Sequence, residues 1–99
     1  MRVISRKTLK CFWERLDCSD AEQPLKAWYK EAEKAVWKNP HDIKNNYATA
    51  SLLGNRRVVF NIGGNKYRLV VALRYDLGIV YIRFVGNHKE YDSIDGERV

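Results

Sequence analysis

The stretch that decides the fold is RVVFNIGGNKYRLVVALRYDLGIVYIRFVG, which runs from Arg57 to Gly86. It contains three runs rich in β-branched residues, separated by the glycine-bearing turns Gly63-Gly64-Asn65 and Asp76-Leu77-Gly78. Short turns of this kind between such runs are typical of β-hairpins. We therefore expect an antiparallel meander with strands over 57–62, 66–75 and 79–86.

Side chains alternate between the two faces of a strand, so the pattern separates two faces of this meander. The first face is apolar and is expected to pack on helices: Val58, Phe60, Ile62, Tyr67, Leu69, Val71, Leu73, Val80, Ile82 and Phe84. The second face receives arginine from every strand, and we expect the helices to leave it uncovered: Arg57, Val59, Asn61, Arg68, Val70, Ala72, Arg74, Tyr81, Arg83 and Val85. A cationic open sheet suits a phosphate backbone and an unstacked base. The alternative is a solvated face whose arginines only discourage aggregation.

Two amphipathic segments precede the meander and predict helices that cover its apolar face. The first follows the capping residue Ser5, and its apolar stripe is Leu9, Phe12, Trp13 and Leu16. The second has capping-box spacing at Asp20 and Gln23, and its stripe is Leu25, Trp28, Tyr29, Ala32, Ala35 and Val36. Residues 1–4 read as a short strand, and residues 40–55 as a polar connection with one helical turn over 42–46. We expect an α+β fold, with two N-terminal helices packed on a small, mostly antiparallel β-sheet, as one domain over residues 1–99.

Composition narrows the classes of function. The 99 residues include 18 Lys and Arg against 12 Asp and Glu, a net charge of +6, which points to a polyanion such as nucleic acid. No apolar run approaches the ~18–20 residues of a membrane span, and the N-terminus lacks the apolar stretch of a signal peptide, so we expect a cytoplasmic protein with no membrane contact. Cys11 and Cys18, with only two histidines besides, give no zinc spacing, and we expect no metal and no cofactor.

The last predicted strand leads into the segment Val85–Asp92, which carries two candidate catalytic side chains, His88 and Tyr91. Cleavage of RNA without a metal needs a base for the 2′-hydroxyl, cations around the phosphorane and an acid for the leaving 5′-oxygen. Histidine transfers protons near neutral pH, and arginine can hold phosphate oxygens bidentately, which makes Arg68 and Arg83 candidates. The plain alternative is that His88 only caps the strand end and Tyr91 only packs.

At this point the chain resembles a known family. The stretches AEQPLKAWYKEAEKAVWKNPHDIK (residues 21–44) and RVVFNIGGNKYRLVVALRYDLGIVYIRFVGNHKEYDSID (residues 57–95) look like the HigB toxins of the RelE superfamily, in which NKYRLV and GNHKEYD are specific in combination. The resemblance implies a RelE-like fold and a type II toxin, an endoribonuclease that cuts mRNA in the ribosomal A site and inhibits translation. It also implies a HigA-like helix-turn-helix antitoxin, through which alone the toxin would meet operator DNA.

Carried over by residue, the family's conserved strand arginine matches Arg68, and its C-terminal catalytic segment matches residues 88–92, with His88 and Tyr91 as the leading candidates. Other superfamily members carry lysines on the first meander strand, where this chain has Val59 and Asn61. The duty of general base then shifts to His88, with Arg57 or Lys66 supplying charge, and which group is base and which is acid stays open. The candidate RNA-binding residues are Arg57, Asn61, Lys66, Arg74, Arg83 and Lys89.

Two other functions compete with RNA cleavage. Toxins of the ParE branch share the fold but inhibit gyrase, and the cationic sheet could also serve a non-catalytic RNA- or ribosome-binding module. The presence of His88 and Tyr91 together with Arg68 favours the nuclease.

Overall fold

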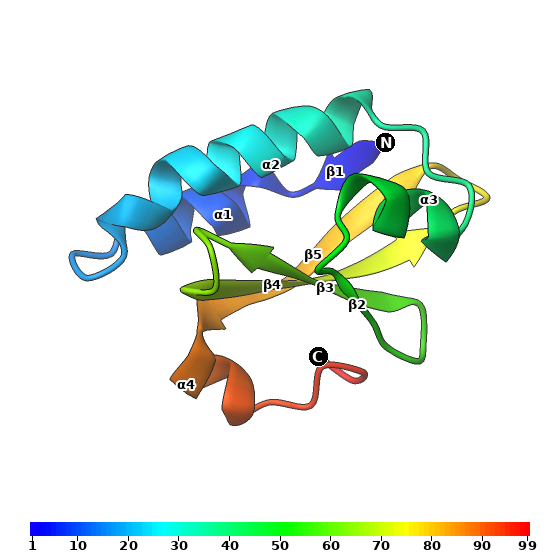
Figure 1. Cartoon of the computed structure of the whole chain (residues 1–99). Coiled ribbons are helices and arrows are strands. Elements are labelled where there is room, and N and C mark those ends of the chain that lie inside the picture. The colour runs from blue at the N-terminus through cyan, green and yellow to red at the C-terminus, as the bar shows by residue number, and fades with distance from the viewer.

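The computed structural model describes residues 1–99, and Figure 1 shows their arrangement. The elements in chain order are β1 (Arg2–Ile4), α1 (Arg6–Trp13), the 3-10 helix η1 (Ser19–Ala21), α2 (Glu22–Lys34), α3 (Pro40–Asn46), β2 (Ser51–Leu52), β3 (Arg57–Ile62), β4 (Tyr67–Arg74), β5 (Ile79–Asn87) and α4 (His88–Asp92).

The sheet has five strands in the order β1-β5-β4-β3-β2. The meander β3-β4-β5 is antiparallel and lies within one residue of the predicted bounds, and β2 extends it antiparallel to β3. The N-terminal strand was also predicted, and it pairs parallel to β5 at the opposite edge. The α+β class with a mostly antiparallel sheet is confirmed.

The main core lies between this sheet and the helices α1, α2 and α3, which cover one face together (Figure 1). Trp28 of α2 packs edge-on against Phe60 of β3 with ring centroids 5.4 Å apart, and Trp37 stacks on the same Phe60 at 6.0 Å. The predicted inward residues of β3 and β4 are all buried here, because burial of their apolar area provides the main driving force for folding.

The predicted helices are too long at their C-terminal ends. Helix α1 ends at Trp13, so Leu16 lies beyond it and is fully exposed rather than part of the stripe. Helix α2 ends at Lys34, and Val36 is 73% exposed. The expected capping box of α2 is absent. Ala21 is the residue before the helix, and the Asp20 carboxylate instead accepts a hydrogen bond from the hydroxyl of Tyr67 in β4.

The connection between α2 and β3 is more ordered than the sequence predicts. Helix α3 begins already at Pro40, because the Asn39 side chain accepts a hydrogen bond from the Asp42 backbone N–H and proline is favoured in a first turn. The two-residue strand β2 was not predicted, since Ser51 and Leu52 are exposed and show no alternation that a pattern could detect.

A β-bulge in β5 changes the predicted faces at the end of the meander. Val71 pairs with Ile82 but Val70 pairs with Phe84, so Arg83 is an extra residue without a partner. The prediction was therefore wrong for two side chains. Phe84 joins the second face of the meander, which carries Arg57, Arg68 and Arg74 and is called the arginine face below, whereas Val85 packs against the main core. One inserted residue reverses the alternation for every residue that follows it in the strand.

The arginine face is also more covered than expected. Helix α4 and the C-terminal segment 93–99 lie beneath the sheet, opposite the three other helices (Figure 1). Val59 and Val70, which pair with one another on this face, are 2% and 0% exposed although neither belongs to the main core. The expectation that helices leave this face uncovered was wrong. Val59 and Val70 at its centre are apolar, and covering them with α4 and residues 93–99 removes their surface from water.

The burial of Trp28 leads to a prediction about stability. Trp28→Ala should lower the free energy of unfolding by about 3–5 kcal/mol, since it removes the ring that packs on Phe60 and leaves a cavity. The control Val36→Ala changes an exposed side chain and should stay within about 0.5 kcal/mol. Urea titration followed by circular dichroism measures both, and equal stabilities for the two variants would contradict the packing described.

Candidate active site

Arg68 lies on the arginine face of the central strand β4, close to the end where β5 leads into α4. It pairs with Asn61 of β3 on one side and Gly86 of β5 on the other. The Asn61 side-chain oxygen accepts a hydrogen bond from the Arg68 guanidinium, and the amide nitrogen of Asn61 donates to the Thr49 carbonyl oxygen at 3.2 Å. The guanidinium forms no ion pair, and its Nε is buried without a hydrogen-bond partner. Arg68 therefore presents an uncompensated positive charge in a fixed orientation.

Tyr91 reaches this guanidinium from α4. The centre of the Arg68 guanidinium lies 5.6 Å from the centroid of the Tyr91 ring, a cation–π distance, and the ring also lies 6.4 Å from that of Phe84. Phe84 can make this contact only because the bulge moves it to the arginine face. Two of the three predicted catalytic residues, Arg68 and Tyr91, are thus in direct contact.

A capping box fixes the start of α4. The Asn87 side chain accepts from the Glu90 backbone N–H at 2.8 Å, and the Glu90 carboxylate accepts from the Asn87 backbone N–H at 3.1 Å. The same carboxylate accepts a hydrogen bond from Arg15, just beyond α1, at 3.1 Å. The Asn87 N–H first, and Arg15 second, lower the pKa of Glu90. The helix that carries Tyr91 is therefore tied both to β5 and to the first helix of the chain.

His88 is the first residue of α4, and its Nε2 contacts the carbonyl oxygen of Asn65 in the turn between β3 and β4. A carbonyl oxygen only accepts, so Nε2 must carry the proton of this hydrogen bond. In the neutral ring Nδ1 is then the free lone pair, and in the charged ring it is the free donor. The exposed imidazole is thus held at the end of the sheet with Nδ1 as the nitrogen available for proton transfer.

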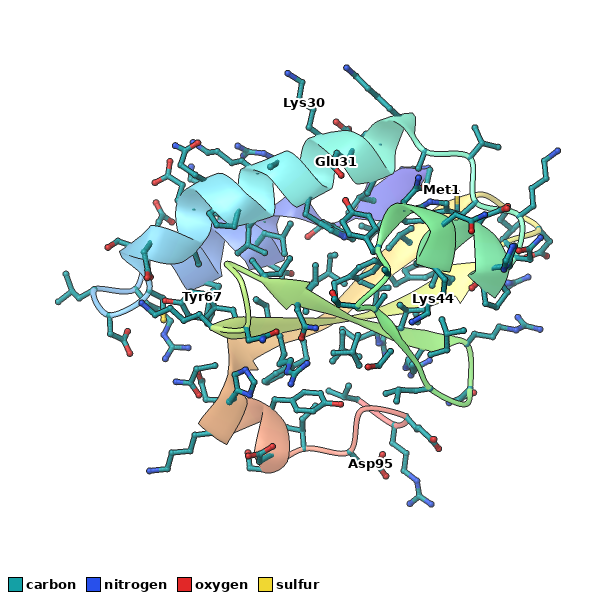
Figure 2. All side chains as sticks on the ribbon, viewed as in Figure 1. Met1, Lys30, Glu31, Lys44, Tyr67 and Asp95 are labelled. Atoms are coloured by element: carbon teal, nitrogen blue, oxygen red, sulfur yellow. The ribbon has the colours of Figure 1, made fainter.

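The β3–β4 turn is itself anchored by Asp20 of η1. This carboxylate accepts from the Lys66 ammonium and from the Tyr67 hydroxyl, the two residues that follow Asn65 in the chain. These two hydrogen bonds lower the pKa of Asp20, and burial together with Asp20 raises the pKa of Tyr67. Lys66, a predicted RNA-binding residue, is engaged by this ion pair, and the turn that contacts His88 is held in place by it. Figure 2 labels Tyr67 at the end of the sheet where the turn lies.

The remaining predicted RNA-binding residues lie in two separate regions of the molecule. Asn61 orients Arg68, and Lys89 follows His88 on the exposed side of α4. Arg57, Arg74 and Arg83 lie instead toward the opposite end of the strands, where Arg74 forms a two-point ion pair with Asp76. Arg83 is therefore not beside Arg68, as the sequence suggested, because the bulge directs it elsewhere.

Sequence reasoning missed the residues that hold the site together. Asn87 and Glu90 have the spacing of a capping box, a signal that was available but not used. Arg15 and Asp20 carry no such signal, because each is separated by more than forty residues from its partners, Glu90 for Arg15 and Lys66 and Tyr67 for Asp20.

These features define a small α+β protein with a cationic site for a polyanion at one end of its sheet. Residues 21–94 match the model of the HigB toxin family, described as the RelE-like toxic component of a toxin–antitoxin system. The chain is 32% identical over 94 residues to the mRNA interferase toxin HigB of Escherichia coli K12, an alignment that covers 93% of this chain and 88% of that protein. The same identity and coverage hold for the mRNA interferase HigB of Escherichia coli O157:H7 and of Shigella flexneri. The chain belongs to the HigB toxin family, and its class implies an antitoxin partner.

No helix combines the length and the apolar composition that crossing a membrane requires.

The capping box of α4 leads to a prediction that can be tested apart from any activity. Glu90→Ala removes the acceptor for the Asn87 N–H and should speed amide hydrogen exchange in α4 about five-fold, since loss of a cap costs about 1 kcal/mol. The pKa of Glu90 is lowered in the folded state, so its contribution is present above its ordinary value and is lost as pH falls through the lowered one. Lowering the pH through the pKa of Glu90 should therefore reduce the protection of α4 against exchange in the parent protein, whereas the variant should show no such additional loss of protection.

The control for this experiment is Glu14→Ala, which removes an exposed carboxylate that forms no ion pair. Exchange measured by mass spectrometry over residues 88–94 should be the same in this control and in the parent. Equal protection of α4 in the Glu90 variant would mean that the capping box does not hold the helix.

Proposed function

We propose that this chain is the toxin of a type II toxin–antitoxin system and an endoribonuclease that cleaves mRNA with Arg68, His88 and Tyr91. Membership of the HigB family and the names of its relatives support the reaction class. The observation that carries the assignment of residues is the unpaired guanidinium of Arg68 in contact with Tyr91, at the sheet end where His88 begins α4. Residues 1–99 act as a single toxin domain in this proposal.

The reaction is transesterification at one phosphate. The 2′-oxygen attacks phosphorus and loses its proton, the bond to the 5′-oxygen breaks, and that oxygen receives a proton, which leaves a 2′,3′-cyclic phosphate and a 5′-hydroxyl. Negative charge on the nonbridging oxygens grows in the pentavalent transition state. Arg68 is suited to stabilise it, because its charge is uncompensated and Asn61 holds it in advance of substrate binding.

His88 transfers a proton through Nδ1. The hydrogen bond to the Asn65 carbonyl oxygen occupies Nε2 in both charge states of the ring, so a single nitrogen alternates between acid and base. We assign it to protonation of the leaving 5′-oxygen. The proton of the 2′-hydroxyl passes to water, and the imidazole regains its proton from solvent once the product leaves. The proposal relies on side chains alone for proton transfer and charge stabilisation, and it needs no metal or cofactor.

Tyr91 has a polar hydroxyl and an aromatic face in the same place. Its ring already contacts the Arg68 guanidinium, so a base of the RNA can extend this stack. Its hydroxyl then orients the nucleotide or assists removal of the 2′-hydroxyl proton. Lys89, next to His88 and exposed, adds a cation for the neighbouring phosphate.

We further propose the cellular setting that the family resemblance implies. The message is cut in the ribosomal A site in the cytoplasm, and translation stops. A HigA-like helix-turn-helix antitoxin silences the toxin and brings it to operator DNA. The net charge of +6 favours an antitoxin segment that is acidic or amphipathic.

The catalytic assignment predicts the effect of three substitutions. Arg68→Ala, His88→Ala and Tyr91→Phe should each slow cleavage of ribosome-bound message by about 10²–10⁴-fold and abolish growth arrest while the protein stays folded. Primer extension on the message measures the cut, and circular dichroism verifies the fold. The control Lys30→Ala removes a charge from a side chain that points away from the sheet on α2, and it should cut at the parent rate (Figure 2).

The result that would contradict the assignment is cleavage at the parent rate by all three folded variants. Induction in cells separates the reaction classes: rapid arrest of translation accompanies RNA cleavage, whereas filamentation with DNA damage accompanies gyrase inhibition. Comparison of naked and ribosome-bound message in the same assay tests dependence on the ribosome.

The proposed antitoxin leads to a prediction about binding. Complex formation with the product of the neighbouring open reading frame should be fast and should weaken steadily as salt rises, because an acidic segment meets a toxin of charge +6. Stopped-flow association at several ionic strengths measures this. Co-expression should restore growth, and unchanged toxicity with that partner would count against it.

A further inference from the structure

A second cationic feature lies away from Arg68. A pocket of about 530 Å³ opens at the other end of the arginine face, and four arginines line it with Tyr81: Arg56, Arg57, Arg74 and Arg83. Arg57 pairs with Ala72, four residues along β3 from the Asn61–Arg68 pair. At about 3.3 Å per residue this places the pocket about 13 Å from the proposed site of cleavage.

Acidic side chains compensate little of the charge of this pocket. Arg74 pairs with Asp76, but no Asp or Glu side chain forms an ion pair with Arg56, Arg57 or Arg83. Arg57 and Arg83 donate instead to the main-chain oxygen of Val99, at 2.9 and 3.2 Å, and the Nε of Arg57 is buried without any partner. The guanidinium groups thus converge on one oxygen and have unused donors.

The backbone keeps Arg56 at the rim of the pocket in an unfavourable conformation. Asn55 and Arg56 both have φ of 59°, and the turn is closed by a hydrogen bond from the Arg57 N–H to the Gly54 carbonyl oxygen at 3.3 Å. A two-residue turn with both central residues left-handed favours glycine at the second position. An arginine is found there, and such local strain is typical of functional positions.

We propose that this pocket is a second phosphate-binding site, which holds the backbone of RNA a few nucleotides away from the scissile phosphate. The inference rests on the proposed function only in taking RNA as the polyanion. A stacked strand advances about 3.4 Å per nucleotide, so about 13 Å corresponds to roughly four nucleotides. A phosphate oxygen takes the place of the Val99 oxygen between Arg57 and Arg83, and the Tyr81 ring in the wall offers a surface for a base.

Binding of RNA that cannot be cleaved tests this site. The probes are 2′-O-methyl oligonucleotides of about three and about ten nucleotides, with fluorescence anisotropy as the readout. Arg83→Ala and Arg56→Gly should each weaken the longer probe about five- to ten-fold and reduce the slope of log affinity against log salt by about 0.7, the share of one phosphate contact. The shorter probe, which reaches only the Arg68 end, should bind as it does to the parent.

Arg56→Gly also separates the role of the side chain from that of the fold. Glycine accepts the left-handed conformation freely, so this variant should melt at or above the temperature of the parent while it binds RNA more weakly. Lys30→Ala removes the same charge from the other side of the molecule and serves as the matched control (Figure 2). It should change neither the affinity for the longer probe nor the salt slope beyond a small general effect.

The source of the phosphates is decided by a second titrant, vacant ribosomes without message. Loss of affinity of the pocket variants for the long oligonucleotide assigns the site to the message strand, and loss for vacant ribosomes alone assigns it to ribosomal RNA. Parent affinity and parent salt slope for both titrants would overturn the proposal. Because the readout is binding of uncleavable RNA, failure of Arg68 or His88 as catalytic groups would leave this result standing.

Discussion

The single extra residue in β5 is the constraint on which the rest of the arginine face depends. The shift in register between Val70 and Val71 leaves Arg83 unpaired and turns Phe84 toward the arginine face. Phe84 then provides the apolar contact on which Tyr91 of α4 rests, and Arg83 projects into the group of arginines at the far end. Without the bulge, Phe84 would point into the main core and α4 would have no ring to pack on.

The candidate site is assembled from distant parts of the chain around a rigid central strand. Arg68 is fixed by β3, whereas the segment that carries His88 and Tyr91 is fixed by hydrogen bonds from β5 and from Arg15 beyond α1. The short helix α4 has no fully buried residue, so its position depends on these polar contacts more than on packing. Such a segment opens locally at a lower free energy than the sheet, as is usual for elements that admit a ligand.

The class of the fold could be predicted because the meander and both main helices have strong local patterns. The ends of α1 and α2 could not, since Leu16 and Val36 continue the apolar spacing beyond the point where the helices stop contacting the sheet. The bulge left no mark in the alternation of residues 79–86, and it reversed the assigned faces of Phe84 and Val85. Arg68, His88 and Tyr91 could be named from their types and their neighbours, but their dependence on Arg15, Asp20 and Glu90 arises from contacts between distant segments, which no local pattern encodes.

All three tryptophans, Trp13, Trp28 and Trp37, lie in the layer between the helices and the sheet. The arginine face has none, and its aromatic residues are Tyr81 and Phe84 of β5 together with Tyr91 of α4. Tryptophan fluorescence therefore monitors the main core alone. Undocking of α4, or binding of a ligand on the arginine face, should leave this fluorescence nearly unchanged. The two layers of this small protein are spectroscopically separate, so a label on α4 and the native tryptophans can follow them independently in one sample.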